Sequence, residues 1–315
     1  MVSIHAQMMI ARGNRKRSVN FMAVYTPDER DSDISLLEVY DTHTGERRIL
    51  RQYDHLIEAP NWSKDGRSLY YNSRGKIWRY DLAGGYDEEI DTGFAANCNN
   101  DHVLSPDGKE IAVSHSEESW ISKVYILPIK GGTPRLVTEK GPSYLHGWSP
   151  DGSQLAYCAF RPEGDGADIY TISTDGGEET RLTDAPGLND GPEYSPDGKY
   201  IWFNSVRSGL MQIWRMKADG SEQTQMTFDE GWNSWFAHIS PDGKRVVYIC
   251  YKKGDLKPGE HLPHKNVELR MMNADGTNVQ TIARLFGGQG TINVNSWSPD
   301  SREFAFVSYR LADKR

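Results

Sequence analysis

Histidines recur in this sequence a few residues ahead of a repeated turn, at a position where a purely structural strand would need only packing residues. His102 lies in NCNNDHVLS, His146 in PSYLHGWS and His238 in NSWFAHIS. Imidazole, carboxylate and amide groups that meet at one opening can bind a polar ligand. We therefore predict a ligand-binding mouth, to which the same segments also contribute Asn100, Asp101, Tyr144, Asp190, Glu193 and Trp235.

A divalent metal ion is one interpretation of this mouth. Imidazole nitrogens from separate segments can bind Zn, Fe, Ni or Mn-type ions, and the other ligands decide which. The candidate ligands are His102, His146, His238, His264 and Gln289. They form no local pair such as H-x-x-x-H, so they would have to converge through the fold. The alternative is a set of hydrogen-bonded polar residues that line a wet channel without a metal ion.

Basic residues recur in a second set of loops. They are Arg74, Arg161, Arg207, Lys252 and Arg310. A ring of guanidinium groups on an acidic protein favours an anionic ligand, and its planar forks suit a carboxylate best. We therefore place Arg161 and Arg207 among the ligand-binding residues. The alternative is that these arginines pair with nearby acids, as Asp165 or Asp168 could do for Arg161.

One four-residue turn occurs six times and sets the spacing of these groups. It reads SKDG from Ser63, SPDG from Ser105, Ser149, Ser195 and Ser240, and SPDS from Ser298. Serine, proline and glycine at these places are the preferences of a type I turn. Successive turn aspartates are separated by 42, 44, 46, 45 and 58 residues. A period in the forties without a helical pattern predicts one four-stranded propeller blade per repeat.

A second hairpin also occurs six times, around glycines 45, 84, 131, 176, 220 and 276. The chain opens with this second hairpin, at residues 39–50, and closes with the first hairpin, at residues 297–309. Neither end makes a whole blade alone. We therefore predict an all-β, six-bladed propeller of four-stranded antiparallel blades, closed by pairing of the two end hairpins. The interval of 58 residues between the last two turns contains an insertion, YKKGDLKPGEHLPHKN. We expect this insertion to bring His261 and His264 to the face that carries the predicted ligand-binding mouth.

Composition narrows the class of protein. The net charge of −8 is spread along the chain, which argues against a nucleic-acid partner. No stretch approaches the roughly 18 to 20 apolar residues of a membrane helix, and the first residues lack a signal-peptide pattern. We therefore expect a cytoplasmic protein without membrane insertion. Cys98, Cys158 and Cys250 are odd in number, which favours reduced thiols. Residues 1–20 are predicted to be disordered or a start-site extension, and residues 21–315 a single propeller domain.

The turn, the apolar strand that follows it and the DGG-type hairpin together resemble the C-terminal propeller of TolB and related WD-like (PD40) repeats. The resemblance covers about residues 35–310. Related propellers gate the hydrolases of the prolyl oligopeptidase class, but no G-x-S-x-G nucleophile elbow is present here. A more distant resemblance is to oligogalacturonate lyases. Those enzymes use a central metal, held mainly by histidines with a glutamine, to break uronate oligosaccharides by β-elimination.

Two functions follow from these observations, and the sequence does not decide whether the protein is an enzyme. The first is a TolB-like propeller that binds a protein or a small, anionic ligand at its central face. The second is a cytoplasmic, metal-dependent enzyme that processes carbohydrate, such as a lyase acting on uronate oligosaccharides. In that case the metal would polarise the carboxylate, Arg207 would bind it, and a histidine or lysine would remove the α-proton.

Overall fold

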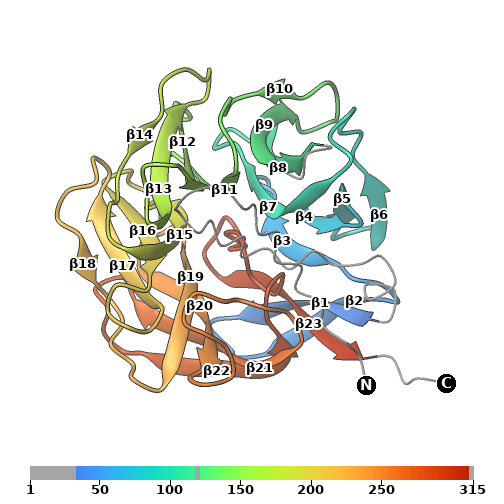
Figure 1. Ribbon diagram of the computed structural model, residues 1–315. Coiled ribbons are helices and arrows are strands. Elements are labelled where there is room, and N and C mark those ends of the chain that lie inside the picture. Colours follow the sequence, from blue (N-terminus) through green and yellow to red (C-terminus); the bar gives the residue numbers. More distant parts are fainter. Residues whose placement is uncertain (1–32, 118–120, 312–315) are drawn as a thin grey trace, which may run out of the picture.

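The computed structural model describes residues 33–117 and 121–311 as an all-β propeller (Figure 1). All the secondary-structure elements in those two ranges are β-strands. None of the described residues forms a helix that could cross a membrane. The predicted disordered segment, residues 1–20, lies outside the described residues. Cys98, Cys158 and Cys250 are buried and form no disulfide, as predicted.

Hydrogen bonds group the strands into five sheets. A three-stranded sheet joins the chain ends through β2 (Arg47–Tyr53), β1 (Asp33–Asp41) and β23 (Glu303–Leu311). The first four-stranded sheet contains β3 (Glu58–Trp62), β4 (Ser68–Ser73), β5 (Lys76–Asp81) and β6 (Tyr86–Glu89). The second contains β7 (Cys98–Leu104), β8 (Glu110–Ser116), β9 (Ser122–Pro128) and β10 (Arg135–Leu136).

The third four-stranded sheet contains β19 (Trp232–Ile239), β20 (Arg245–Lys252), β21 (Lys265–Asn273) and β22 (Gln280–Gly287). The remaining sheet has eight strands. Its first half is β11 (Ser143–Trp148), β12 (Gln154–Phe160), β13 (Gly166–Ser173) and β14 (Thr180–Arg181). Its second half is β15 (Gly187–Tyr194), β16 (Tyr200–Ser205), β17 (Gln212–Lys217) and β18 (Thr224–Gln225).

This arrangement corrects the predicted fold class of six separate, four-stranded antiparallel blades, which is wrong. Four of the five sheets have four or more strands and the fifth has three. Two repeats merge because β13 and β15 pair in parallel through Gly166 with Gly187 and Ala167 with Leu188. Glycine has no Cβ, so the backbones at Gly166 and Gly187 can approach closely. The strand expected at Trp297 is only an isolated bridge to Phe304, which leaves the end sheet with three strands.

The two ends of the described chain lie side by side in that three-stranded sheet (Figure 1). β1 and β23 pair antiparallel from Asp33 with Leu311 to Asp41 with Glu303. Leu37 and Val307 are buried in one apolar cluster beneath the pair. Burial of their side chains stabilises the contact by roughly 1.5–3 kcal/mol for each large apolar residue.

The repeated turn works as its residue types predict. In each copy the Oγ of the first serine donates to the Oδ1 of the aspartate two residues later, at 2.6–2.7 Å. The fourth position has a positive φ in every copy, 74° at Gly66 for example. Glycine adopts this conformation without strain in five copies, and Ser301 adopts it in the sixth, at 62°. These turns end the strands β3, β7, β11, β15 and β19, which surround the centre of the molecule in Figure 1.

All five of these central strands are interrupted by a bulge or register shift against their neighbour. A bulge turns side chains away from the strict alternation of a strand and re-aims them. The shift in β7 falls between Cys98 and His102, and the shift in β11 falls between Leu145 and Gly147. Five polar side chains of the candidate site come from these shifted segments: Glu58, Asn100, Asp101, His146 and Asp190.

Candidate functional site

One buried imidazole lies between two buried carboxylates at the centre of the propeller. His146 Nε2 is 3.3 Å from Asp190 Oδ1 and 3.7 Å from Asp101 Oδ1. Each residue sits in or beside the register shift of its strand: Asp101 in β7, His146 in β11 and Asp190 in β15. The structure therefore brings three of the sequence-predicted residues together.

Amide side chains extend this group. Asn293, in the segment before β23, donates from Nδ2 to Asp101 Oδ1 at 2.6 Å and to Asn100 Oδ1 at 3.3 Å. Asn100 in turn donates to Glu58 Oε1 at 3.3 Å. We call Glu58, Asn100, Asp101, His146, Asp190, His261 and Asn293 the central cluster.

Mutual charges determine the protonation states in this cluster. Burial opposes the charged form of His146, but Asp101 and Asp190 outweigh it and raise the pKa of His146 to about 9. Burial also opposes ionisation of Asp190, yet the hydrogen bond and charge of His146 lower its pKa to about 2. For Asp101 burial dominates and raises the pKa to about 6. At neutral pH one imidazolium therefore faces two carboxylates, and the three groups carry a net negative charge.

The insertion between β20 and β21 covers this cluster. The His261 ring lies 4.4 Å from Trp235 and 5.2 Å from Phe236, measured between ring centroids. Burial lowers the pKa of His261 to about 4. Leu262 O accepts from the backbone N of Gln289 at 3.3 Å, which ties the insertion to the segment before β23.

Two buried polar atoms in the cluster are unsatisfied. Within residues 33–117 and 121–311, neither Asn293 Oδ1 nor His261 Nδ1 has a hydrogen-bond partner. Buried polar atoms are normally paired, so unpaired ones mark a place that a ligand or ordered water can occupy. Asn293 Oδ1 and the carboxylates of Glu58, Asp101 and Asp190 make the cluster rich in acceptors.

A second buried group lies toward the turn end of the central strands. His238 Nδ1 lies 2.6 Å from Glu193 Oε2, and His238 Nε2 lies 3.1 Å from Ile292 O. Glu193 Oε1 also accepts from the backbone N of Ile239 at 2.9 Å and from Asn295 Nδ2 at 2.6 Å. This network joins β15, β19 and the segment before β23, and it uses both ring nitrogens of His238. Its role is to hold these segments together.

The two predicted ligand-binding arginines do not face the mouth, which corrects the sequence interpretation. Arg161 is buried and makes hydrogen bonds to Glu179, Pro142 O and Ser143 Oγ. Its partner is Glu179 and not Asp165 or Asp168. Arg207 stacks over the Trp214 ring at 4.8 Å and donates to Ser205, Asn189 and Gln223. Both guanidinium groups therefore link strands within their own sheet.

The remaining predicted residues are scattered. His102 is fully buried 3.4 Å from Tyr70 O, and burial lowers its pKa to about 4. His264 stacks on Phe286 with 5.9 Å between ring centroids, and Gln289 is half-buried. Trp235 is fully buried under the insertion, and Tyr144 is half-buried with its ring 6.4 Å from Phe160.

The predicted metal ligands do not assemble into a metal site. Among the described residues no group of three or more His, Cys, Asp or Glu side chains could hold a metal ion. His238 Nδ1 and Nε2 already contact Glu193 and Ile292 O, and His102 is fully buried with its Nε2 beside the backbone carbonyl of Tyr70.

Three members of the central cluster were absent from the predicted site residues: Glu58, His261 and Asn293. A positional signal could have found two of them. Counting five residues back from each turn serine gives Glu58, Asn100, Tyr144, Asp190, Trp235 and Asn293. His261 belongs to the insertion, and no repeat position indicates where its side chain lies.

Comparison with known proteins agrees with the fold and the repeats. Residues 105–261 match the family described as the TolB beta propeller domain, PD40. An uncharacterised protein of Agrobacterium fabrum is 49% identical over 276 residues, which cover 87% of this chain and 92% of that protein. A solved structure from Agrobacterium tumefaciens, whose protein carries the provisional name TolB, is 48% identical with a TM-score of 0.84. It covers 89% of this chain and 99% of that chain.

More distant proteins have lower sequence identity to this chain. The Tol-Pal system protein TolB of Francisella tularensis is 28% identical over 84% of this chain, and the match spans 59% of that protein's length. An oligogalacturonate lyase in complex with manganese is 15% identical with a TM-score of 0.53, covering 89% of this chain and 97% of that chain. At that identity the likeness is one of fold alone.

Proposed function

Because the chain belongs to the TolB-like β-propeller family, we propose that it is a binding protein whose central cluster receives a cationic, donor-rich group of a protein partner. Such a group is the side chain of an arginine or a lysine. The observation that carries this proposal is the buried arrangement of Asp101, His146 and Asp190, with its net negative charge.

Hydrogen-bonding balance supports a donor-rich ligand. Asn293 Oδ1 is an unused acceptor, and the carboxylates of Glu58, Asp101 and Asp190 lie in the same cluster. A guanidinium has five N–H donors and an ammonium has three, and neither has an acceptor. Such a group would satisfy the acceptors and reduce the net negative charge at the same time.

The same balance argues against the small anionic ligand that the basic loops suggested. Arg161 and Arg207 are engaged within their own sheets, so they do not offset the negative charge of the cluster. An anion placed beside Asp190 would meet a like charge. The uronate lyase alternative relied on these arginines and on a metal, and it has no comparable support.

A protein partner is favoured over a free small molecule for two reasons. Glu58 and Tyr144 are half-buried, so part of the mouth is accessible to a side chain that a larger body presents. The Francisella relative is named as a component of the Tol-Pal system, which makes protein association the working expectation for this chain.

Selection from a random peptide library tests the proposal. Phage-displayed peptides selected on the purified protein are expected to be enriched in arginine or lysine. Titration calorimetry then compares one selected peptide on the wild type, Glu58→Gln and Asp190→Asn. Loss of a charge partner at the cluster is expected to weaken the Kd about tenfold or more, or roughly 1.4 kcal/mol.

The matched control is Asp54→Asn, because the Asp54 side chain is 99% exposed and lies outside the cluster. It is expected to leave the Kd unchanged. Thermal unfolding checks that each variant is folded. Enrichment of acidic peptides, absence of any enrichment, or equal binding by wild type, Glu58→Gln and Asp190→Asn would each refute the proposal.

A further inference from the structure

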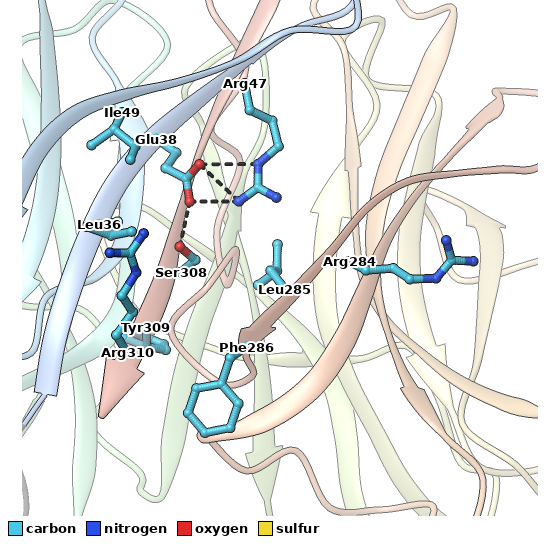
Figure 2. Close-up of a pocket in the computed structure, with 10 residues that line it drawn as sticks. All are labelled: Leu36, Glu38, Arg47, Ile49, Arg284, Leu285, Phe286, Ser308, Tyr309 and Arg310. Carbon is cyan, nitrogen blue, oxygen red and sulfur yellow. Dashed lines mark hydrogen bonds and ion pairs between the residues drawn. The ribbon is translucent and has the colours of Figure 1, made fainter. Parts of the chain in front are cut away.

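A cleft of about 310 Å³ opens between the three-stranded end sheet and β22, and none of its lining residues belongs to the central cluster. Figure 2 shows its lining: Glu38, Arg47, Ser308 and Arg310 come from the end sheet, and Leu285 and Phe286 come from β22. From this geometry we infer that the cleft binds a small carboxylate with an apolar body. The inference does not depend on the proposed function of the central cluster.

The charge of the cleft favours an anion. Arg47, Arg284 and Arg310 line it with a single acid, Glu38. Arg47 pairs with Glu38 and Arg284 pairs with Glu268, so Arg310 contributes the positive charge that no acid among the described residues offsets. The whole chain carries −8, so this positive cleft stands apart from the rest of the protein.

The acid in the cleft is already satisfied from within the protein. Glu38 is buried, follows a register shift between Leu37 and Glu38, and receives hydrogen bonds from Arg47 and Ser308 (Figure 2). Arg47 uses Nε and Nη2 for this contact, and no bond from its Nη1 is found among the described residues. A ligand carboxylate therefore has little competition from Glu38.

Arg310 supplies an available guanidinium. It is exposed near the end of β23 and has no hydrogen-bond or ion-pair partner among residues 33–117 and 121–311. Arg284, at the outer edge, pairs with Glu268 through Nε at 3.0 Å while its side chain remains 77% exposed. Planar guanidinium forks match a carboxylate in a bidentate geometry, which is why we infer this anion.

Apolar side chains form the rest of the wall. Leu36, Leu285 and Phe286 line the cleft, and Ile49 is 51% exposed beside them. A volume of about 310 Å³ lies at the lower end of the range for small-molecule sites, which is roughly 300–1,000 Å³. The cleft therefore fits an acid whose body is one or two rings or a short alkyl chain.

The test uses 2-naphthoate as the probe and 2-naphthalenemethanol, which has the same rings without the charge, as its neutral counterpart. Titration calorimetry on the full chain is expected to show saturable binding of the acid and at least tenfold weaker binding of the alcohol. Arg310→Gln is expected to weaken the acid about fivefold or more, the loss of roughly 1 kcal/mol for one charge-assisted contact. The alcohol should bind Arg310→Gln and the wild type alike.

Arg48→Gln is the matched control, because Arg48 lies on the same sheet, is 60% exposed and does not line the cleft. It should bind 2-naphthoate like the wild type. The inference is overturned if the acid does not bind, if acid and alcohol bind equally, or if Arg310→Gln and Arg48→Gln behave alike. Asp190→Asn should leave naphthoate binding intact, which separates this result from the fate of the central cluster.

Discussion

His146 Nε2 lies 3.3 Å from Asp190 Oδ1, in a part of the propeller where both side chains are buried. A buried ion pair of this kind is costly to desolvate, and removing one partner leaves the other charge uncompensated. The pair joins β11 to β15, so it links the two halves of the eight-stranded sheet. Substitution of His146 or Asp190 should therefore change both the free energy of unfolding and the affinity for a ligand.

The pH dependence of unfolding tests the charge on His146. Its pKa is about 9 in the folded protein, against 6.5 for an unperturbed histidine, so the folded state holds this proton more tightly than the unfolded chain does. The stabilisation is fully present below pH 6.5 and is lost as the pH rises through 9, by about 3 kcal/mol in total. In His146→Gln this loss should be absent, so the stability gap between wild type and variant should narrow from pH 6.5 to 9.

Urea denaturation at several pH values measures the gap. The control is His43→Gln, because His43 is exposed. The difference in free energy of unfolding between His43→Gln and the wild type should stay constant from pH 6.5 to 9. A gap between wild type and His146→Gln that stays constant from pH 6.5 to 9 would show that His146 is neutral in the folded protein.

The local structure of this protein follows directly from its sequence. Ser63 and Asp65, like their five counterparts, form the predicted turn through a short side-chain hydrogen bond, because the required residues are adjacent in the chain. The merger of β13 with β15 was not predictable in the same way. It depends on Gly166 and Gly187 meeting in a parallel pairing of strands that are not consecutive in the chain, which no periodic pattern records.

Ion pairing explains why the site was only partly predictable. Arg161 looked like a ligand-binding residue because its loop position repeats, yet its partner Glu179 lies 18 residues further along the chain. The nearer Asp168 pairs instead with Arg181, at 2.5 Å. By contrast, Asp101, His146 and Asp190 come from corresponding strands of three repeats, four, three and five residues before their turn serines, so the fold brings their segments together. Repeat position predicts which segment reaches the centre, but not which partner each charge finds.

Arg161 should therefore matter for stability and not for binding. Its side chain is 4% exposed and Glu179 is 11% exposed, so Arg161→Ala leaves a largely buried carboxylate without its main partner. We expect a loss of about 3–5 kcal/mol in the free energy of unfolding. Arg48→Ala removes an exposed pair with Glu303 and should cost at most about 1 kcal/mol. Urea unfolding measures the free energy of unfolding of both variants. If Arg161→Ala and Arg48→Ala lose similar amounts, the Arg161–Glu179 ion pair does not stabilise the fold more than an exposed pair does.

His261 should control access to the central cluster. Its ring packs on Trp235 and Phe236, and such aromatic contacts contribute about 0.5–1.5 kcal/mol each. His261→Ala should make local opening easier, so amides in residues 253–264 and 287–295 should exchange about tenfold faster. Hydrogen-exchange mass spectrometry measures this. Lys257→Ala is the control, since that side chain is 80% exposed in the same insertion. Equal exchange in both variants would show that the cover does not depend on His261.

Glu193 offers a sharper test, because two substitutions of the same residue should differ. Glu193→Ala leaves the Ile239 backbone N, Asn295 Nδ2 and His238 Nδ1 without their acceptor, and each unsatisfied buried group costs about 1–3 kcal/mol. Glu193→Gln can keep all three contacts. Its Oε1 accepts from Ile239 and Asn295, while its Nε2 donates to His238 in the tautomer whose Nε2–H donates to Ile292 O.

We therefore expect Glu193→Ala to lose about 3–5 kcal/mol in the free energy of unfolding and Glu193→Gln to lose about 1 kcal/mol or less. Urea denaturation at neutral pH compares the two with Glu110→Ala, whose side chain is 41% exposed and should be near neutral. If Glu193→Gln is as damaging as Glu193→Ala, the Glu193–His238 contact requires the carboxylate charge. If both substitutions lower the free energy of unfolding by about 1 kcal/mol or less, the hydrogen bonds of Glu193 do not hold β15 to β19.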